Sequence, residues 1–310
     1  MIRIYKTDTT LKEVKKVKKI VSDCWIDLVS PSEREIDEVV KKTKIDKDLI
    51  MKMMDEDELP RIEQSGNATL IVIDTPSLED DNYITYPLGI IITDNNYVIT
   101  ISPRKLFVLD DFIKNKVKDF RTAKKKRFLI QILLKTSSLY LKILRKVDKD
   151  IEEKEEILKE NTKNDDLIEL LEIEKTLVYF ITSLKANDLV LEKLNKKTVF
   201  PLFENDLDLL EDAMIENKQA IEMSGIYRDI LKSISDTYEA VVSNNLNTAM
   251  KFLASITIVL SIPTMISSFL GMNIPLSDLG SNPYSIIIVT IVSIILSLFV
   301  MILLKRKNML

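Results

Sequence analysis

Two long apolar segments near the C-terminus dominate the hydrophobic pattern of this chain. Residues 252–270 and residues 285–304 contain no charged side chain, and the basic triplet Lys305-Arg306-Lys307 follows the second segment directly. A helix needs roughly 20 apolar residues to cross the hydrocarbon core of a bilayer. Core helices of a soluble domain are shorter and usually keep a polar face. The pattern therefore predicts two transmembrane helices, over residues 247–270 and 284–304.

The positions of basic residues predict how the two segments are oriented. Lys251 precedes the first segment, the basic tail 305–310 follows the second, and the loop 271–283 between them contains no Lys or Arg. Lys and Arg accumulate on the cytoplasmic side of membrane proteins. We therefore expect a multi-pass protein of the cell membrane, in contact with membrane lipid, with both termini in the cytoplasm.

The first 126 residues alternate between strand and helix patterns. Short runs rich in Ile, Val, Thr and Tyr predict strands, and Ser32 with Glu35 forms a capping box that predicts a helix start. We expect a cytosolic α/β domain with a partly antiparallel sheet. Its predicted strands cover residues 2–5, 22–28, 69–74, 84–93 and 97–101, and its predicted helices cover residues 32–40 and 46–54.

The chain from residue 127 to residue 246 is predicted to be entirely helical. Apolar residues at spacings of three and four predict two helices, up to about residue 161 and from 164 to about 194, which form a charged hairpin over residues 127–200. A cytosolic stalk helix over residues 201–246 then continues into the first span. Residues 204–239 hold ten acidic and three basic side chains, a net charge of −7. We expect this helix to pack against copies of itself or against the hairpin.

Composition excludes several classes of function. The chain has 310 residues, a formal net charge of −4, no His and a single Cys, Cys24. The charge gives no reason to expect nucleic acid as a partner, and the absence of His removes Ser–His triads and most zinc enzymes. We interpret Cys24 as a buried, inert thiol. The five glycines form no phosphate-binding loop, so we expect neither an enzyme nor an organic cofactor.

Two Lys-rich runs raise the question of contact with anionic lipid. They cover residues 12–19 and 124–127. We interpret both as solvated surface.

One face of the first span carries small and polar side chains. They recur at intervals of three and four, as a helix requires, and this polar stripe consists of Asn247, Met250, Ala254, Thr257, Ser261, Thr264 and Ser268. Small residues allow membrane helices to approach closely, whereas a row of hydroxyls could also face a water-filled pore. The stripe alone does not distinguish these alternatives. The acidic cytosolic helix and the absence of enzyme chemistry favour the pore.

The chain resembles the CorA family of magnesium transporters. The resemblance is carried by Gly271-Met272-Asn273 at the outer end of the first span, together with the basic tail. A second match is the stretch Asp57-Glu58-Leu59-Pro60-Arg61-Ile62-Glu63, which precedes a strand. The order of the predicted segments also matches the family over essentially the whole chain: an α/β domain, a charged helical hairpin, a long stalk helix and two spans.

The resemblance implies a funnel-shaped homopentamer that takes up Mg²⁺ passively, with Co²⁺ and Ni²⁺ as further divalent cations. It implies a selectivity filter of Gly271, Met272 and Asn273, in which amide oxygens suit a hydrated Mg²⁺. Met250 and Leu253 would form an apolar neck that gates by dewetting. The implied pore-lining residues are Asn247, Met250, Leu253, Thr257, Ser261 and Thr264.

The resemblance also implies that cytosolic Mg²⁺, bound between subunits, closes the channel. Asp212 falls at the family's regulatory position, and its neighbours Glu211, Asp208 and Glu216 could share the role, although an ordinary solvated acid is an equally good interpretation. Residues 51–54, Met-Lys-Met-Met, depart from the family because an acid that faces Asp212 is expected there. Leu270 before the motif and an outer loop with a single acid, Asp278, are further departures.

Two other functions remain as alternatives. A zinc transporter of the same superfamily is disfavoured by the absence of His and by the single Cys, since zinc sites prefer such ligands. A non-conducting membrane-anchored scaffold belongs to a different class, and a measurement of ion flux distinguishes it from a channel.

Overall fold

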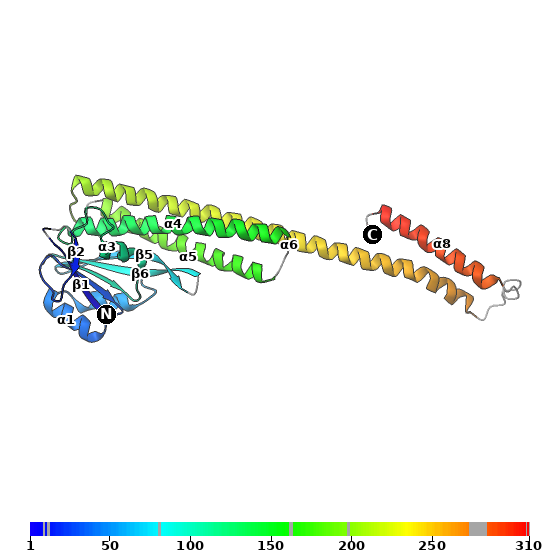
Figure 1. Ribbon diagram of the computed structural model, residues 1–310, viewed down its shortest axis with the longest axis horizontal. Coiled ribbons are helices and arrows are strands. Elements are labelled where there is room, and N and C mark those ends of the chain that lie inside the picture. Colours follow the sequence, from blue (N-terminus) through cyan, green and yellow to red (C-terminus); the bar gives the residue numbers. More distant parts are fainter. Residues whose placement is uncertain are drawn as a thin grey trace. The chain divides into compact units, whose positions relative to one another are not determined.

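The computed structural model describes residues 1–8, 10, 13–79, 82–160, 164–196, 199–272, 284–307 and 309 (Figure 1). The chain divides into two compact units, Met1–Ser233 and Ile234–Leu310. The boundary falls within one helix, α6 (Glu204–Leu270), so that α6 contributes to both units.

A seven-stranded mixed sheet is the centre of the first unit. The strand order is β2-β1-β3-β7-β6-β5-β4. Among the described strands only β3 and β7 pair in parallel. The long β5–β6 hairpin pairs Ala68 with Thr93 at one end and Glu79 with Asn82 at the other. The strands are β1 (Ile2–Thr7), β2 (Val14–Lys16), β3 (Trp25–Val29), β4 (Arg61–Ser65), β5 (Ala68–Glu79), β6 (Asn82–Thr93) and β7 (Val98–Ser102).

Helices cover both faces of this sheet, so the unit has three layers (Figure 1). One face packs against α1 (Glu33–Thr43), α2 (Lys47–Met51) and the 3₁₀ turn η1 (Lys52–Met54), with Ile36, Leu49 and Met53 in the core. The other face packs against α4 (Lys125–Glu160) and α5 (Asn164–Asn195). Strands buried on both faces read as continuous apolar runs, as in residues 88–92, and in residues 98–101 the run is interrupted only by Thr100. The turn η2 (Phe107–Leu109) and the short α3 (Asp110–Ile113) lead into α4.

A buried polar network fixes the register of β1 and β3. Asp27 is fully buried and accepts hydrogen bonds from Arg3 Nη2 at 2.5 Å and from Thr100 Oγ1 at 2.8 Å. Thr100 in turn accepts a hydrogen bond from Trp25 Nε1. Burial raises the pKa of the Asp27 carboxyl, and the charge of Arg3 opposes that rise. Because every partner is supplied, the charge can be held inside the sheet.

The structure confirms most predicted elements of this unit and adds several. The helices predicted from residues 32 and 46, the hairpin helices and three of the five strands lie within a few residues of the predicted bounds. The predicted strand 22–28 begins only at Trp25, and the predicted strand 69–74 extends to Glu79. Three elements, β2, β4 and α3, were not predicted from the sequence. β2 lies in the Lys-rich run that was interpreted as solvated surface, although Val14 is buried.

The helix α6 begins in the first unit and is tied there to α4. The carboxylate of Asp206 accepts a hydrogen bond of 2.9 Å from Arg127 Nη1, and Ser138 donates a hydrogen bond to Glu216. α6 begins at Glu204, three residues after the predicted start of the stalk helix at 201, and continues without interruption through Pro263 to Leu270.

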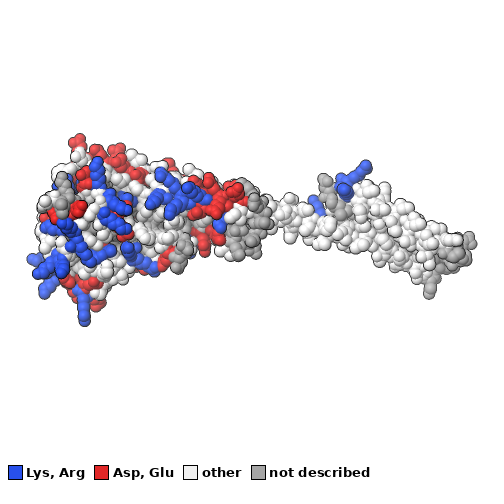
Figure 2. All heavy atoms as spheres, viewed as in Figure 1, with Lys and Arg blue, Asp and Glu red and all other residues white. Residues whose placement is uncertain are grey.

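The second unit consists of the remainder of α6 and of α8 (Ser285–Arg306). Among the described residues these two helices are long and apolar enough to cross a membrane, with mean hydropathies of 1.9 and 3.2 in their most apolar windows. Charged side chains are scattered over the first unit in Figure 2. In the second unit three basic residues, Lys305, Arg306 and Lys307, follow one another where α8 ends, and Lys251 is a further basic residue on α6.

Candidate functional site

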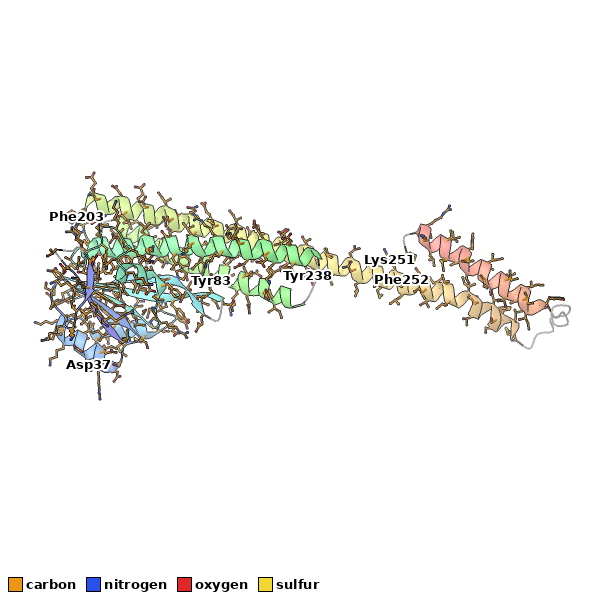
Figure 3. All side chains as sticks on the ribbon, viewed as in Figure 1. Asp37, Tyr83, Phe203, Tyr238, Lys251 and Phe252 are labelled. Atoms are coloured by element: carbon orange, nitrogen blue, oxygen red, sulfur yellow. The ribbon has the colours of Figure 1, made fainter. Side chains whose placement is uncertain are left out.

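The polar stripe of α6 is exposed along the second unit. Lys251 and Phe252, labelled in Figure 3, mark the point at which α6 changes from polar to apolar sequence. Met250 and Leu253 are 63% and 62% exposed, although both are large and apolar. The other residues named from the family resemblance as pore-lining are also exposed in the single chain, namely Asn247, Thr257, Ser261 and Thr264.

The hydroxyls of the stripe are oriented by the backbone of their own helix. Thr257 Oγ1 donates to Leu253 O at 2.8 Å, Ser261 Oγ donates to Ile258 O at 2.8 Å, and Thr264 Oγ1 donates to Leu260 O at 3.1 Å. A hydroxyl has one donor and two acceptor lone pairs. Since each donor is used within α6, each oxygen presents its lone pairs away from the helix. The stripe is thus a row of hydrogen-bond acceptors.

The same stripe lines an open hollow with several apolar side chains. Thr257, Ser261, Thr264 and Ser268 share this surface with Met272 of the predicted filter. They also share it with three residues that were not predicted to line a pore, namely Leu260, Met265 and Phe269. Their spacing along the helix places them beside the stripe, so helical periodicity could have identified them.

The opposite face of α6 is the one that is covered. Ser255 is fully buried and donates a hydrogen bond of 2.8 Å to Met309 O, while Val259, Ile262 and Ile266 on the same face are partly buried. Ser255 and Thr257 lie two positions apart, so at about 100° per residue their side chains point to nearly opposite sides. On α8 the least exposed positions recur every three or four residues, at Val289, Ser293, Ser297, Val300 and Leu304. The small serines allow close helix packing.

The structure describes only part of the predicted filter. Gly271 N–H donates to Ser267 O at 3.0 Å and therefore continues the last turn of α6, and Met272 is 51% exposed. A Cβ at position 271 would come no closer than 3.5 Å to the nearest atom, so the single chain itself does not require glycine there. Asn273 and the rest of the predicted outer loop, up to residue 283, lie outside the described residues.

Three of the four candidate regulatory acids form an exposed row on α6 in the first unit. Asp208, Glu211 and Asp212 are spaced as neighbours on one helix face, and none of them forms an ion pair with a described residue. Glu216, one turn further on, is held by Ser138. Among the described residues no three acidic, His or Cys side chains lie close enough to hold a metal ion.

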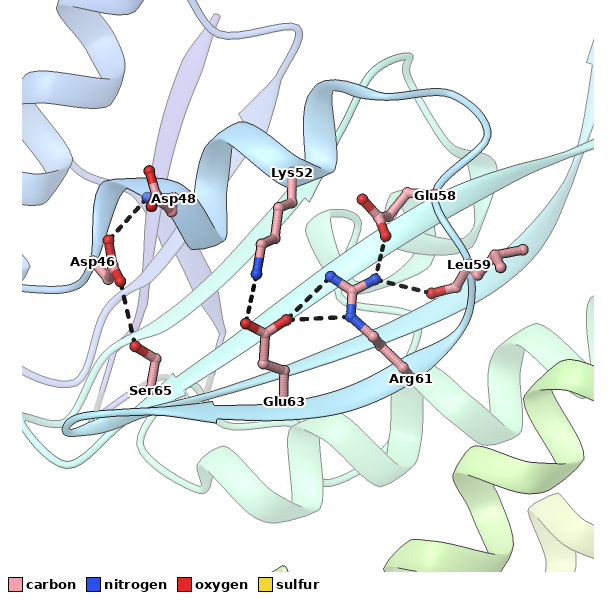
Figure 4. A network of polar contacts seen from close by, with 8 residues as sticks. All are labelled: Asp46, Asp48, Lys52, Glu58, Leu59, Arg61, Glu63 and Ser65. Carbon is pink, nitrogen blue, oxygen red and sulfur yellow. Dashed lines mark hydrogen bonds and ion pairs between the residues drawn. The ribbon is translucent and has the colours of Figure 1, made fainter.

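The stretch 57–63, on which the resemblance partly rests, leads into β4 and includes its first three residues (Figure 4). Arg61 lies between Glu58 and Glu63 and hydrogen-bonds to both carboxylates. Lys52 Nζ donates to Glu63 at 2.6 Å, and this hydrogen bond, with the help of Arg61, lowers the pKa of Glu63. The segment in which the family resemblance led us to expect an acid thus contributes a cation, Lys52, and a fully buried Met53. It supplies no carboxylate to face Asp212.

Comparisons with known proteins agree with this architecture. The family model described as "CorA-like Mg2+ transporter protein" matches residues 22–306. The cobalt/magnesium transport protein CorA of Methanocaldococcus jannaschii is 30% identical over 286 residues, which are 89% of this chain and 88% of that protein.

Solved structures show the same fold. The complete structure of the CorA magnesium transporter from M. jannaschii matches with a TM-score of 0.88 at 27% identity, covering 100% of this chain and 99% of that one. The full-length CmaX protein matches with a TM-score of 0.73 over 98% of this chain and 97% of its own, and at 13% identity it shares the fold alone. The extent of the family match and the identity to the M. jannaschii protein show that this chain belongs to the CorA-like Mg²⁺ transporter family.

Proposed function

We propose that the chain forms a channel for the passive uptake of Mg²⁺ across the cell membrane, with Co²⁺ and Ni²⁺ as further permeant ions. Members of the family are membrane transporters for divalent cations and not enzymes. The inside-negative membrane potential would drive uptake, at about 2.3 kcal/mol per charge per 100 mV. Both termini lie in the cytoplasm in this proposal, because the basic residues flank the cytoplasmic ends of both spans.

The observation that carries the proposal is the polar stripe of α6, which α8 leaves uncovered. In the single chain the stripe is exposed and faces away from the buried Ser255 face. In lipid, the hydroxyls of the stripe and the amide of Asn247 would have no water to hydrogen-bond with. If several copies of the chain surround a common axis, the stripe of each copy can face a water-filled pore. We propose a homopentamer, funnel-shaped, in which the first spans line the pore and α8 lies outside them.

The chemistry of the stripe suits a hydrated dication. Mg²⁺ gives up its water reluctantly and is often bound through that water. Water molecules around a cation point their hydrogens outward, and the lone pairs of Thr257, Ser261 and Thr264 are free to accept them. Asn273 would place a ring of amide oxygens at the outer mouth, with Gly271 and Met272 as the rest of the filter. Met250 and Leu253 would form an apolar neck that closes by dewetting.

Closure is proposed to depend on Mg²⁺ bound between copies of the chain in the cytosol. Asp208, Glu211 and Asp212 are exposed and lack a cationic partner among the described residues. Carboxylates brought together across an interface repel each other, and a bound dication relieves that repulsion. Loss of the ion at low cytosolic Mg²⁺ would then loosen the assembly and open the pore. Lys52 departs from the family pattern, so the partner ligands come from other groups of the neighbouring copy.

The test is Mg²⁺ influx into proteoliposomes that contain the purified protein, beside an Asn273→Ala variant. Asn95→Ala is the matched control, since Asn95 is an exposed residue between β6 and β7. We expect influx with the native chain and the control, and its loss with Asn273→Ala. No influx with any of the three, followed by none with Co²⁺ or Zn²⁺, would contradict a channel and leave the non-conducting scaffold.

A further inference from the structure

Two exposed ridges of side chains run along α5 and α6 in the first unit. The members of each ridge recur at intervals of three and four residues, as one face of a helix requires, and all of them are exposed. The α5 ridge consists of Leu171, Lys175, Val178, Thr182, Lys185, Leu189 and Lys193. The α6 ridge consists of Asp208, Asp212, Ile215, Gln219, Glu222, Ile226 and Ile230.

Large apolar side chains are exposed along both ridges. On α5, Leu171 and Leu189 are 58% and 62% exposed, and on α6, Ile215 and Ile226 are 57% and 56% exposed. Exposed apolar side chains that repeat along one surface and are rimmed by charges mark a site of protein–protein contact. We infer that each ridge is covered by another protein surface.

The two ridges carry opposite charges. The α5 ridge holds three lysines and no acid, whereas the α6 ridge holds three acids and no base. Partly buried acids, Glu174 and Glu192, lie only at the flank of the α5 ridge. None of the six charged ridge residues forms an ion pair with a described residue. Each ridge therefore complements the other in charge as well as in apolar character.

The two ridges of one chain cannot meet each other. Within the chain α6 already packs on α5 through other faces, where the buried Asn217 donates a hydrogen bond of 3.0 Å from Nδ2 to Leu184 O. Both ridges are exposed and so lie outside this contact. Two complementary surfaces at different places on one chain produce a head-to-tail contact between copies, which closes into a ring when the rotation allows.

The contact between Asn217 and Leu184 also sets the levels of the two helices. α5 and α6 are antiparallel and rise equally per residue, so thirteen residues from this pair Ile230 of α6 is level with Leu171 of α5. Rotation about an axis that runs along α6 moves no residue along that axis. Leu171 of one copy is therefore level with Ile230 of the next copy.

The same count brings the opposite charges of neighbouring copies together. Nine residues from the pair in the other direction, Lys193 is level with Asp208. The remaining two lysines lie within about one helical turn of the remaining two acids. The resulting pairs are Lys193 with Asp208, Lys185 with Asp212, and Lys175 with Glu222.

We propose that the α5 ridge of each copy packs against the α6 ridge of the next copy and thereby closes the cytosolic ring. The inference rests on the proposed function, which supplies the ring and its axis, and it adds the surface by which the copies join. A cation at Asp208 and Asp212 competes with the neighbouring lysines, whereas contact between Leu171 and Ile230 needs no ion. The copies consequently stay joined when cytosolic Mg²⁺ is low.

The test is disulfide formation in the full-length protein that carries Leu171→Cys and Ile230→Cys, oxidised with copper phenanthroline in proteoliposomes. We expect a ladder of covalent oligomers on a denaturing gel, with and without Mg²⁺, because each chain offers one thiol to each of its two neighbours. Each single variant should remain monomeric, since like positions do not meet and Cys24 is fully buried. Cross-linking by Ile230→Cys alone overturns the head-to-tail contact.

The register has its own control. Leu171→Cys combined with Asp208→Cys uses the same two ridges, but Asp208 lies about 33 Å from Ile230 along α6, so no ladder is expected. An equal ladder from this combination, or no ladder from Leu171→Cys with Ile230→Cys, overturns the proposal. Mg²⁺ influx is measured on the same reduced samples. Influx without the expected ladder rejects the interface alone, and a ladder without influx rejects the channel alone.

Charge reversal provides a second test, at exposed positions where folding is not at risk. Lys175→Glu and Glu222→Lys should each slow the cross-linking of Leu171→Cys with Ile230→Cys about tenfold, since attraction becomes repulsion at every contact of the ring. The two reversals together should restore the rate. Lys41→Glu is the matched control, because Lys41 is exposed on α1. A loss shared by the control, or no restoration in the combined variant, contradicts the proposed pairing.

Discussion

Ser255 and Met309 are joined by a hydrogen bond of 2.8 Å, from the hydroxyl of Ser255 on α6 to the backbone carbonyl of Met309 just beyond α8. Ser255 is fully buried. The bond therefore brings the C-terminal end of the chain against one face of the first span. That face lies opposite Thr257, so the position of α8 determines which side of α6 remains for the proposed pore.

We predict that Ser255→Leu destabilises the pairing of α6 with α8. The larger side chain has no room at a fully buried position, and overpacking of this kind costs about 1–3 kcal/mol. Ser255→Ala removes only the hydrogen bond and should cost about 1 kcal/mol. The measurement is the thermal unfolding midpoint of the detergent-solubilised protein. Ser268→Leu is the control, since Ser268 is exposed on the stripe, and a midpoint lowered as much by Ser268→Leu as by Ser255→Leu would contradict the packing.

We predict that cysteines on the two faces of α6 differ in their reactivity. In proteoliposomes under low Mg²⁺, Thr257→Cys and Ser261→Cys should react with charged, water-borne thiol reagents, because the proposed pore wets their face. Val259→Cys should remain unreactive, because its face is directed away from the stripe and is partly covered. Alkylation of the first two should also block influx. Equal protection of all three positions in conducting protein contradicts the pore assignment.

The unsubstituted protein is the control for that labelling experiment, because its one cysteine is Cys24. Cys24 is fully buried, and burial raises the pKa of its thiol, so little reactive thiolate is present at neutral pH. We expect no labelling of the unsubstituted protein, and no substitution of Cys24 is needed.

The long helices were predictable from sequence, whereas the edges of the sheet were not. α6 and α8 follow from apolar runs without charge, and β6 and β7 follow from runs buried on both faces. β4 reads Arg-Ile-Glu-Gln-Ser, and β2 reads Val-Lys-Lys. Edge strands carry such charged residues because one side of their backbone has no strand to pair with. The signal for β4 was the turn after it, where Gly66 adopts a positive φ of 56°.

The spacing of hydroxyls predicted the polar stripe, but the sequence could not show which face of α6 meets α8. α8 is apolar on almost every face, so its periodicity carries little information. Ser293 and Ser297, one turn apart, were the available signal for its packing face.

We predict that Asp74 makes the first unit less stable at neutral pH than at acidic pH. Burial raises the pKa of its carboxyl from 3.8 to about 6, against a weaker, opposing hydrogen bond from Ser183. A group with a raised pKa is protonated more readily in the folded state. Its cost is therefore absent below pH 3.8, grows as the pH rises and is complete above about 6.

Asp74→Asn removes this cost while keeping the shape of the side chain. A pKa shift of about two units corresponds to about 3 kcal/mol in the free energy of unfolding. We expect about 2 kcal/mol, because the side chain is only partly buried and solvent screens its charge. The unfolding midpoint at pH 7 should rise by about 5 °C, and the gain should vanish near pH 4. Asp57→Asn is the control, because Asp57 is an exposed acid that lines one surface hollow together with Asp74. A gain that is independent of pH, or one shared by the control, contradicts the assignment to Asp74.

We predict that Asp212→Ala weakens inhibition of influx by Mg²⁺ on the cytosolic side. In proteoliposomes with Mg²⁺ titrated on that side, the concentration for half inhibition should rise about tenfold or more, because a full carboxylate charge is lost from the proposed site. Glu216→Ala is the matched control. It removes the same charge one turn further along α6, from a carboxylate that Ser138 already holds within the chain, so inhibition should be unchanged.

The acids beside Asp212 require a second variant, because Asp208 and Glu211 are exposed on the same face and can share a bound ion. Replacement of all three acids by Ala should abolish inhibition while leaving influx at low Mg²⁺ intact, since none of them lies on the polar stripe. If inhibition survives in the triple variant, closure does not depend on this row. Because Lys52 occupies the segment where a facing acid was expected, that outcome would place the closing ion elsewhere on the subunit interface.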